Sequence, residues 1–117
     1  INVVQHLVKE AHANIETKDC EKFTPLVFAA LGGHLDVVRH LLQAKANLEA
    51  RTMQGQTALS IATILGKTNV VQYLVKEAHA NLETKDSKIY KTPLMRASEA
   101  GRLDIVRCLL EAKANLE

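Results

Sequence analysis

The feature that most constrains the fold of this chain is an internal repeat. The stretch TPLVFAALGGHLDVVRHLL, residues 24–42, returns as TALSIATILGKTNVVQYLV, residues 57–75, and as TPLMRASEAGRLDIVRCLL, residues 92–110. Self-similarity with a period near 33 residues is typical of small supersecondary units that stack, because each unit alone cannot bury its apolar face. We therefore expect function at the positions that differ between units, since the shared positions build the stack.

A second, longer repeat spans two units. The segment NVVQHLVKEAHANIETKD, residues 2–19, returns almost unchanged at residues 69–86, whereas the other two units end with AKANLE, at residues 44–49 and 112–117. The KEAHAN version is one residue longer than QAKAN or EAKAN. The loop that follows the second half of each unit should therefore alternate in geometry.

Each unit carries the signals of two helices. A threonine opens each copy and can cap a helix through its side-chain oxygen, and Pro25 and Pro93 occupy a first helical position where a missing N–H costs nothing. Gly33, Gly66 and Gly101 should end that first helix, because glycine enters the left-handed region without penalty. The second helix should place an apolar stripe against the stack, made of Val38, Leu41 and Leu42, then Val71, Leu74 and Val75, then Val106, Leu109 and Leu110.

Length and composition fit a single helical domain and do not indicate which class of partner it binds. The 117 residues are 47% apolar but only 3% aromatic, and the formal net charge is +2. Such a mild charge does not by itself indicate a nucleic acid or an anionic membrane. Two cysteines without metal or redox spacing favour a reducing, intracellular compartment such as the cytoplasm. No apolar run of about 18 residues and no signal-peptide pattern is present, so no membrane contact is expected within this segment.

The order of these features resembles the ankyrin repeat family, most clearly in DCEKFTPLVFAALGGHLDVVRHLLQAKANLEA, residues 19–50. The resemblance covers essentially the whole chain. It implies an all-α solenoid of stacked antiparallel helix pairs joined by hairpin-like β-finger loops, with the fingers and first helices on the concave side. The chain then divides into a leading half repeat, 1–17, and three repeats, 18–50, 51–84 and 85–117.

The chain also departs from the family's pattern. The histidine of the family's TPLH motif is replaced by Val27, Ser60 and Met95, so its side-chain hydrogen bond is lost from the first and third units. The glycine of the finger survives only as Gly55. Lys22 and Tyr90 take its place elsewhere, at a cost of about 1 to 2 kcal/mol each if they keep a left-handed conformation.

No constellation for catalysis, metal binding or a cofactor is present. The five histidines lack zinc-ligand spacing, and no nucleophile elbow, phosphate-binding loop or dinucleotide fingerprint occurs. We therefore expect no enzyme and no cofactor. Cys20 should be an ordinary exposed thiol, and Cys108 should pack in the helical stripe.

The resemblance points to a protein-binding surface made of finger and first-helix residues that vary between units. These candidates are Lys18, Cys20, Glu21, Phe23, Leu31, Arg51, Met53, Gln54, Gln56, Ile64, Leu65, Lys85, Ser87, Lys88, Ile89, Tyr90, Lys91 and Glu99. Several are apolar, as partner sites often are, and the basic members would suit an acidic partner.

Three alternatives remain open. In the first, the apolar candidates, above all Leu31 and Leu65, pack beneath a neighbouring finger, and the basic candidates form a solvated rim. In the second, the segment is a spacer in a longer array, and its ends, which lack polar caps, either continue into further repeats or self-associate. In the third, a nucleotide or nucleic acid binds the basic fingers with strongly salt-dependent affinity.

Overall fold

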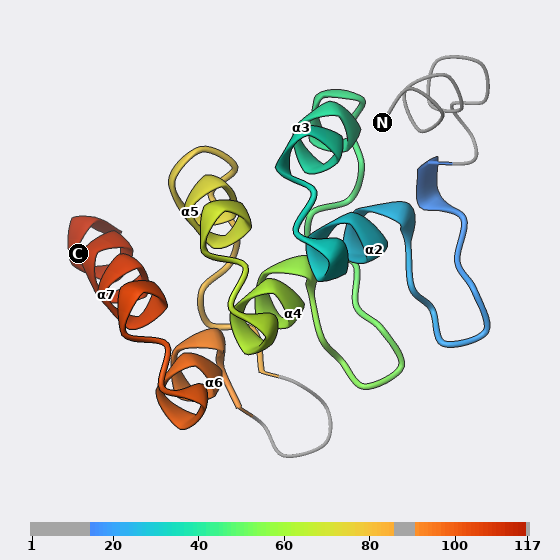
Figure 1. Ribbon diagram of the computed structural model, residues 1–117. Coiled ribbons are helices and arrows are strands. Elements are labelled where there is room, and N and C mark those ends of the chain that lie inside the picture. The colour runs from blue at the N-terminus through green and yellow to red at the C-terminus, as the bar shows by residue number, and fades with distance from the viewer. Residues whose placement is uncertain (1–14, 86–90, 117) are drawn as a thin grey trace.

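Six helices form three antiparallel pairs in the computed structural model of this chain, which describes residues 15–85 and 91–116 (Figure 1). The pairs are α2 (Pro25–Gly32) with α3 (Leu35–Gln43), α4 (Ala58–Leu65) with α5 (Thr68–Lys76), and α6 (Pro93–Ala100) with α7 (Leu103–Leu116). The first helices α2, α4 and α6 lie side by side in one layer, and α3, α5 and α7 lie in the other. None of the described residues forms a β-strand, so the loops before α2 and α4 are turns rather than strands.

The predicted helix starts and ends are confirmed. The Oγ1 atoms of Thr24, Thr57 and Thr92 each accept a hydrogen bond of 3.3 Å from a backbone N–H three residues later. Gly33, Gly66 and Gly101 end the first helices in the left-handed region, with φ of 72°, 73° and 71°. Each first helix is therefore only eight residues long, which keeps the unit short.

Two of these glycines also lie beneath a side chain of the next repeat. A Cβ at Gly33 would be 2.9 Å from Cδ of Lys67, and a Cβ at Gly66 would be 2.7 Å from Cζ of Arg102. The methylene groups of Lys67 thus lie over the end of α2, and the guanidinium of Arg102 lies over the carboxyl end of α4, where the helix dipole favours positive charge.

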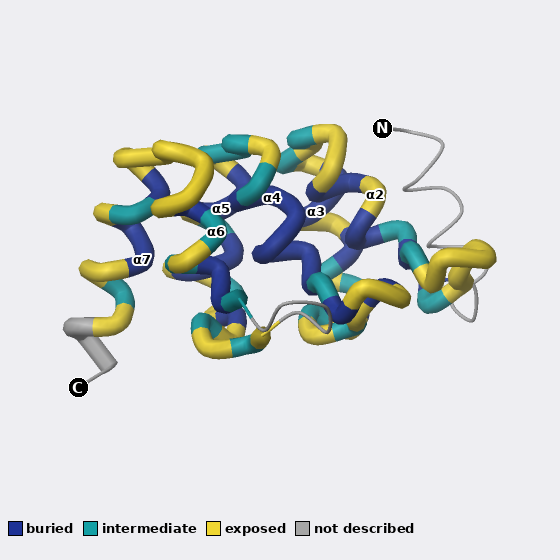
Figure 2. Tube along the Cα trace, turned by 90° about the horizontal axis from the view of Figure 1, so that it is seen from below, coloured by how far each residue is buried: buried dark blue, intermediate teal, exposed yellow. Residues whose placement is uncertain are grey.

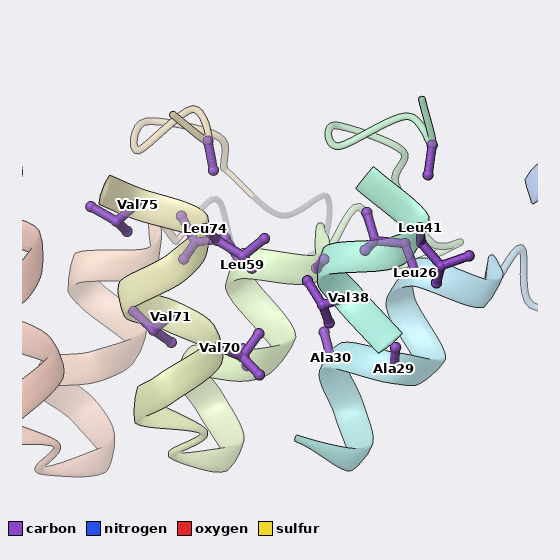
Figure 3. Close-up of a cluster of buried hydrophobic side chains, with 14 of the residues drawn as sticks. Leu26, Ala29, Ala30, Val38, Leu41, Leu59, Val70, Val71, Leu74 and Val75 are labelled. Carbon is purple, nitrogen blue, oxygen red and sulfur yellow. The ribbon is translucent and has the colours of Figure 1, made fainter. Parts of the chain in front are cut away.

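Aliphatic side chains fill the space between the layers (Figure 3). Leu26 and Leu59 of the first helices and Leu41 and Leu74 of the second helices are at most 1% exposed. Alanines on the first helices let them approach closely, since they carry no bulk to separate the backbones. Burial is deepest in the middle of the stack and weaker toward its surface and its last repeat (Figure 2).

The last repeat departs from two expectations. Leu110, expected in the apolar stripe, is 49% exposed, because α7 packs on α5 and α6 and no described element covers its other side. The helix also continues to Leu116 through the segment AKANL, whereas α3 ends before the same letters at Gln43. The closing segment of the last repeat is thus helical, which the repeat pattern did not predict.

The loops after α3 and α5 differ by the one residue that the sequence shows. Ala46 donates its backbone N–H to the carbonyl of Leu41, five residues earlier, and Ala80 donates to Leu74, six residues earlier. Lys45 and His79 take positive φ values of 74° and 56° to make these turns. The extra residue is therefore absorbed locally, and Ala46 and Ala80 both remain buried.

A carboxylate ties each of these loops to the preceding one. Glu16 accepts a hydrogen bond of 2.7 Å from the backbone N–H of Asn47, and Glu49 accepts one of 2.8 Å from Asn81. The asparagine side chains in turn accept from the N–H groups of Glu49 and Glu83. Successive repeats are thus joined by polar contacts as well as by the core.

Candidate partner-binding surface

The loops before the three first helices, residues 18–23, 51–56 and 85–91, are called fingers 1, 2 and 3. In finger 1 the Asp19 carboxylate accepts hydrogen bonds of 2.9 Å from the N–H groups of Glu21 and Phe23. In finger 2 the Thr52 hydroxyl accepts from Gln54 and Gln56, each at 3.3 Å. A short oxygen-bearing side chain therefore braces the turns of fingers 1 and 2 from within.

The tight turn needs a left-handed residue at the same place in both fingers. Lys22 has φ of 65° and Gly55 has φ of 76°. Lys22 thus keeps the left-handed conformation of the missing glycine, the case for which the sequence analysis gave a strain of about 1 to 2 kcal/mol. Tyr90, which takes the place of this glycine in finger 3, lies outside the described residues.

Hydrogen bonds to backbone carbonyls connect neighbouring fingers. The N–H of Met53 donates a 3.0 Å hydrogen bond to the carbonyl of Glu21, which joins finger 2 to finger 1. Arg51 donates from Nε to the Gly55 carbonyl at 3.0 Å and from Nη2 to the carbonyl of Lys85, which joins finger 2 to finger 3. Arg51 therefore positions the fingers, although the sequence suggested only a contact with a partner.

The inner face of the first helices is the face that carries Phe28 and Leu31 and the matching residues of the later repeats. Its side chains change from apolar to charged along the stack. On α2 the exposed side chains are Phe28 and Leu31, at 49% and 40%, and the rings of Phe28 and Phe23 lie 5.2 Å apart between centroids. On α4 the matching residues are Ile61, which is buried, and Ile64, which is half-buried. The face is thus aromatic and aliphatic over the first repeat and aliphatic over the second.

Over the third repeat the same positions are charged. Arg96 and Glu99 replace the isoleucines, and Lys91 of finger 3 also reaches Glu99. The Lys91 ammonium, through its hydrogen bond and its charge, lowers the pKa of the Glu99 carboxyl, with a smaller lowering from Arg96 and a partly opposing effect of desolvation. Two cations therefore share one carboxylate at this end of the face.

Most of the candidates that the structure describes are exposed on the fingers or on this inner face. The exposed ones are Lys18, Cys20, Glu21, Leu31, Arg51, Met53, Gln54, Leu65, Lys85 and Glu99, and the half-buried ones are Phe23, Gln56, Ile64 and Lys91. Leu31 and Leu65, for which packing beneath a neighbouring finger was the alternative, are 40% and 42% exposed. Ser87, Lys88, Ile89 and Tyr90 lie outside the described residues.

Sequence reasoning missed two exposed apolar residues on the first helices, Phe28 and Met95, which are 49% and 51% exposed. Their positions differ between units, as Phe28, Ile61 and Arg96 or Val27, Ser60 and Met95. The same rule of variation between units would have found them. The sequence analysis took its first-helix candidates only from the last turn of each helix, where Leu31, Ile64, Leu65 and Glu99 lie.

The described residues contain no group of three or more histidine, cysteine or acidic side chains that could hold a metal ion. A hollow of about 570 Å³ lies between the end of α5 and α7, lined by Lys76, His79, Glu111 and aliphatic side chains. It opens on the layer of second helices, away from the inner face of the first helices.

These features define a repeat protein of stacked helix pairs that presents a row of short, braced fingers. The family model described as "Ankyrin repeats (3 copies)" matches residues 1–86 and 52–117, and the chain belongs to the ankyrin repeat family. Repeats of this family generally serve as protein–protein interaction modules.

Two curated relatives match part of the chain. Ankyrin repeat domain-containing protein 49 of Bos taurus is 48% identical over 42 residues, which are 36% of this chain and 18% of that protein. The Mus musculus protein of the same name is 49% identical over 39 residues, 33% of this chain and 16% of that protein. The matched segment thus spans less than a fifth of either relative. None of the described helices has both the length and the apolar character needed to cross a bilayer.

Proposed function

We propose that this chain is a non-catalytic protein-binding module that receives a protein partner on the concave surface formed by the fingers and by the inner face of α2, α4 and α6. The observation that carries the proposal is the exposure of Phe28, Leu31, Met53 and Leu65 at positions that vary between otherwise similar units. Exposed apolar side chains on adjacent elements mark interaction sites more often than single ones do.

The braced fingers support this function on energetic grounds. Asp19 and Thr52 fix the turns, and Arg51 together with the Met53 N–H connects one finger to the next. A surface held in this way loses little conformational entropy when a partner binds, so more of the contact energy contributes to affinity. The division into repeats 18–50, 51–84 and 85–117, and a reducing cellular compartment, are part of the same proposal.

A nucleic acid is a weaker candidate for this surface. Finger 1 carries two lysines against two acids, and the guanidinium of Arg51 is used between the fingers. A spacer role has one observation in its favour, because Leu103 and Leu110 of α7 are 58% and 49% exposed. These two leucines lie on the second helix of the last repeat, so the two functions can be tested with separate variants.

The experiment compares three forms of the chain in a crosslinking pull-down read by mass spectrometry. The first is the parent, the second carries Phe28→Ser, Leu31→Ser and Met53→Ser, and the third carries Leu103→Ser and Leu110→Ser. All five side chains are exposed, so thermal melts followed by circular dichroism should stay close to that of the parent. We expect a partner that the parent and the α7 variant capture and the concave variant loses. Capture that the α7 changes abolish and the concave changes spare would favour the spacer function instead.

A further inference from the structure

We propose that the closing segment, residues 112–116, has two forms: a helical form that extends α7, as in Figure 1, and a loop form that folds over the hollow between α5 and α7. The proposal follows from one sequence that is found in two conformations. AKANLE is a loop after α3 at residues 44–49, whereas the same letters from residue 112 are helical up to Leu116. These letters alone do not select a conformation, so the contacts around each copy decide it.

The loop copy depends on one strained residue and one charged acceptor. Lys45 takes a positive φ of 74°, which allows the N–H of Ala46 to donate to the carbonyl of Leu41 at 3.0 Å. The N–H of Asn47 then donates to the carboxylate of Glu16 at 2.7 Å. The left-handed lysine disfavours this loop, and the charge-assisted hydrogen bond compensates for it.

The acceptor for another such loop is already present in the last repeat. The N–H of Asn81 donates to the Glu49 carboxylate at 2.8 Å, so the loop after α5 lies beside the loop after α3. Glu83 occupies the position of Glu49 one unit later in the sequence. Its carboxylate lies 3.4 Å from Nζ of Lys113 in the helical form, close to the segment that would supply the next N–H.

The hollow lies where this further loop would fold. Its volume is about 570 Å³, and the described residues that line it include Ala80 and Leu82 of the loop after α5 and Glu111 and Ala112 of α7. Each loop of the stack lies beside the loop of the preceding repeat, as the two carboxylate contacts show. A loop formed by the closing segment would therefore lie against Ala80 and Leu82 and fill the hollow.

The two forms exchange contacts of similar strength. The helical form keeps its backbone hydrogen bonds and the exposed pair of Glu83 with Lys113, which contributes little. The loop form places Lys113 at the left-handed position of Lys45, but it offers the N–H of Asn115 to the Glu83 carboxylate and removes apolar surface of the hollow from water. A small change at either residue should therefore shift the populations.

This two-state segment would respond to whatever contacts the end of the stack. A molecule or side chain that enters the hollow binds the helical form alone and so increases its population. A surface that packs on the folded loop has the opposite effect. The device does not depend on what binds the concave surface.

The test is NMR spectroscopy of the isotope-labelled full chain, which contains its own two references. The Cα shifts of residues 44–47 give the loop values for these letters, and those of residues 105–109 give the helical values. Exchange at a helix end is fast, so each observed shift is a population average. We expect the parent shifts at residues 113–115 to lie near the helical reference, displaced toward the loop reference.

Lys113→Gly should raise the ratio of loop to helix roughly tenfold, because glycine enters the left-handed region without the penalty that lysine has there. The amide proton of Asn115 should then approach the shifts of Asn47 and Asn81, which donate to carboxylates. Lys113→Ala is the matched control, since it removes the same charge but favours the helix. It should move the Cα shifts toward the helical reference.

Two further substitutions in the Lys113→Gly background identify the acceptor. Glu83→Gln should lower the ratio of loop to helix about three- to tenfold, because a neutral acceptor forms a weaker hydrogen bond. Glu111→Gln removes another acid that lines the same hollow and should leave the ratio unchanged.

Several results would overturn the proposal. Coil-like shifts at residues 113–115 of Lys113→Gly, without the displaced Asn115 amide, would show that the helix end only frays. Helical shifts that Lys113→Gly leaves in place, or a parent chain already at the loop reference, would leave a single form. Movement toward the loop in Lys113→Ala, or equal effects of Glu83→Gln and Glu111→Gln, would exclude the mechanism. None of these results bears on the concave surface, which the pull-down tests separately.

Discussion

The carboxylate of Glu49 lies 2.8 Å from the backbone nitrogen of Asn81, 32 residues later in the chain, and so connects two repeats with one hydrogen bond. Glu83 occupies the same position in the next unit but pairs with the Nζ atom of Lys113, 3.4 Å away. The same residue type thus makes two kinds of contact, and their contributions can be compared.

We expect Glu49→Ala to lower the free energy of unfolding by about 1 kcal/mol, because a backbone N–H loses a charged acceptor. Glu83→Ala should lower it by less than about 0.5 kcal/mol, since an exposed ion pair contributes little. Urea unfolding followed by circular dichroism measures both. Equal losses for the two variants would show that the contact with Asn81 has no special role.

The interhelical glycines give a second comparison. Gly66 and Gly101 have φ of 73° and 71°, but only Gly66 lies beneath a side chain, that of Arg102. Gly101→Ala should cost about 1 to 2 kcal/mol from the left-handed backbone alone. Gly66→Ala should cost a few tenths of a kcal/mol more, because the guanidinium must move from the carboxyl end of α4.

Arg102→Ala provides the control for this difference. In the Arg102→Ala background the two alanine substitutions should become equally costly, as a double-mutant cycle from denaturant melts would reveal. If Gly66→Ala still costs more stability than Gly101→Ala in the Arg102→Ala background, the extra cost has another cause.

Two threonines of the second repeat should respond to valine with opposite signs. Thr63 is fully buried and its Oγ1 atom has no hydrogen-bond partner, whereas the Oγ1 of Thr57 caps α4. Thr63→Val should raise stability by up to about 1 kcal/mol, because an unpaired buried hydroxyl is replaced by a methyl of similar shape. Thr57→Val should lower it by about 1 kcal/mol through loss of the cap. Thermal melts of the two variants test the signs, and destabilisation by Thr63→Val would contradict the first prediction.

The two cysteines should differ in reactivity toward an alkylating reagent. Cys20 is exposed in finger 1, whereas Cys108 is buried on α7, where burial raises the pKa of its thiol, Lys76 opposes this, and Glu111 adds to it. Since the thiolate is the reactive species, iodoacetamide should label Cys20 quickly and Cys108 only on unfolding. Peptide mass spectrometry after timed labelling, with and without urea, distinguishes the sites. Similar labelling rates in the native chain would argue against the burial of Cys108.

Acidification should weaken the cluster at the end of the concave surface. The pKa of Glu99 is lowered in the folded chain, chiefly by Lys91, so its contribution to stability is present above its ordinary pKa and is lost as the pH falls through the lowered value. The stability difference between the parent and Glu99→Gln should therefore shrink below the ordinary glutamate range. Denaturant melts from neutral to strongly acidic pH follow it. A difference that stays constant with pH would exclude the ionised carboxylate as its source.

The positions shared between units were the ones that sequence predicted well. Thr57 as a cap and Gly66 as a stop depend on local chemistry, and the residues that follow them decide the outcome within one turn. The apolar stripe was predicted for the same reason, except at Leu110, whose burial depends on what covers α7. Local signals thus determine where helices begin and end, whereas exposure depends on neighbours that a single unit does not specify.

The candidate surface was predicted less completely because its side chains contact one another and the backbone of neighbouring fingers. Nothing in the finger sequences indicates that Arg51 would bind the carbonyls of two fingers, or that Lys91 and Arg96 would share Glu99. Phe28 was missed because the candidates on the first helices were taken only from the last turn, whereas Phe28 lies one turn earlier. Variation between units found the surface, and only the structure separated its positioning residues from those left exposed.

The helix contacts between repeats join neighbouring units along the chain: α2 meets α4, α4 meets α6, α3 meets α5 and α5 meets α7. The stretch of chain that must be closed to form any of them stays near one repeat length, whatever the number of units. Because the entropy of closure depends on that stretch and not on the total length, a longer array would meet no larger kinetic barrier than a short one. Units could then be gained or lost by duplication at little cost to the speed of folding, as the near-identical segments 2–19 and 69–86 suggest.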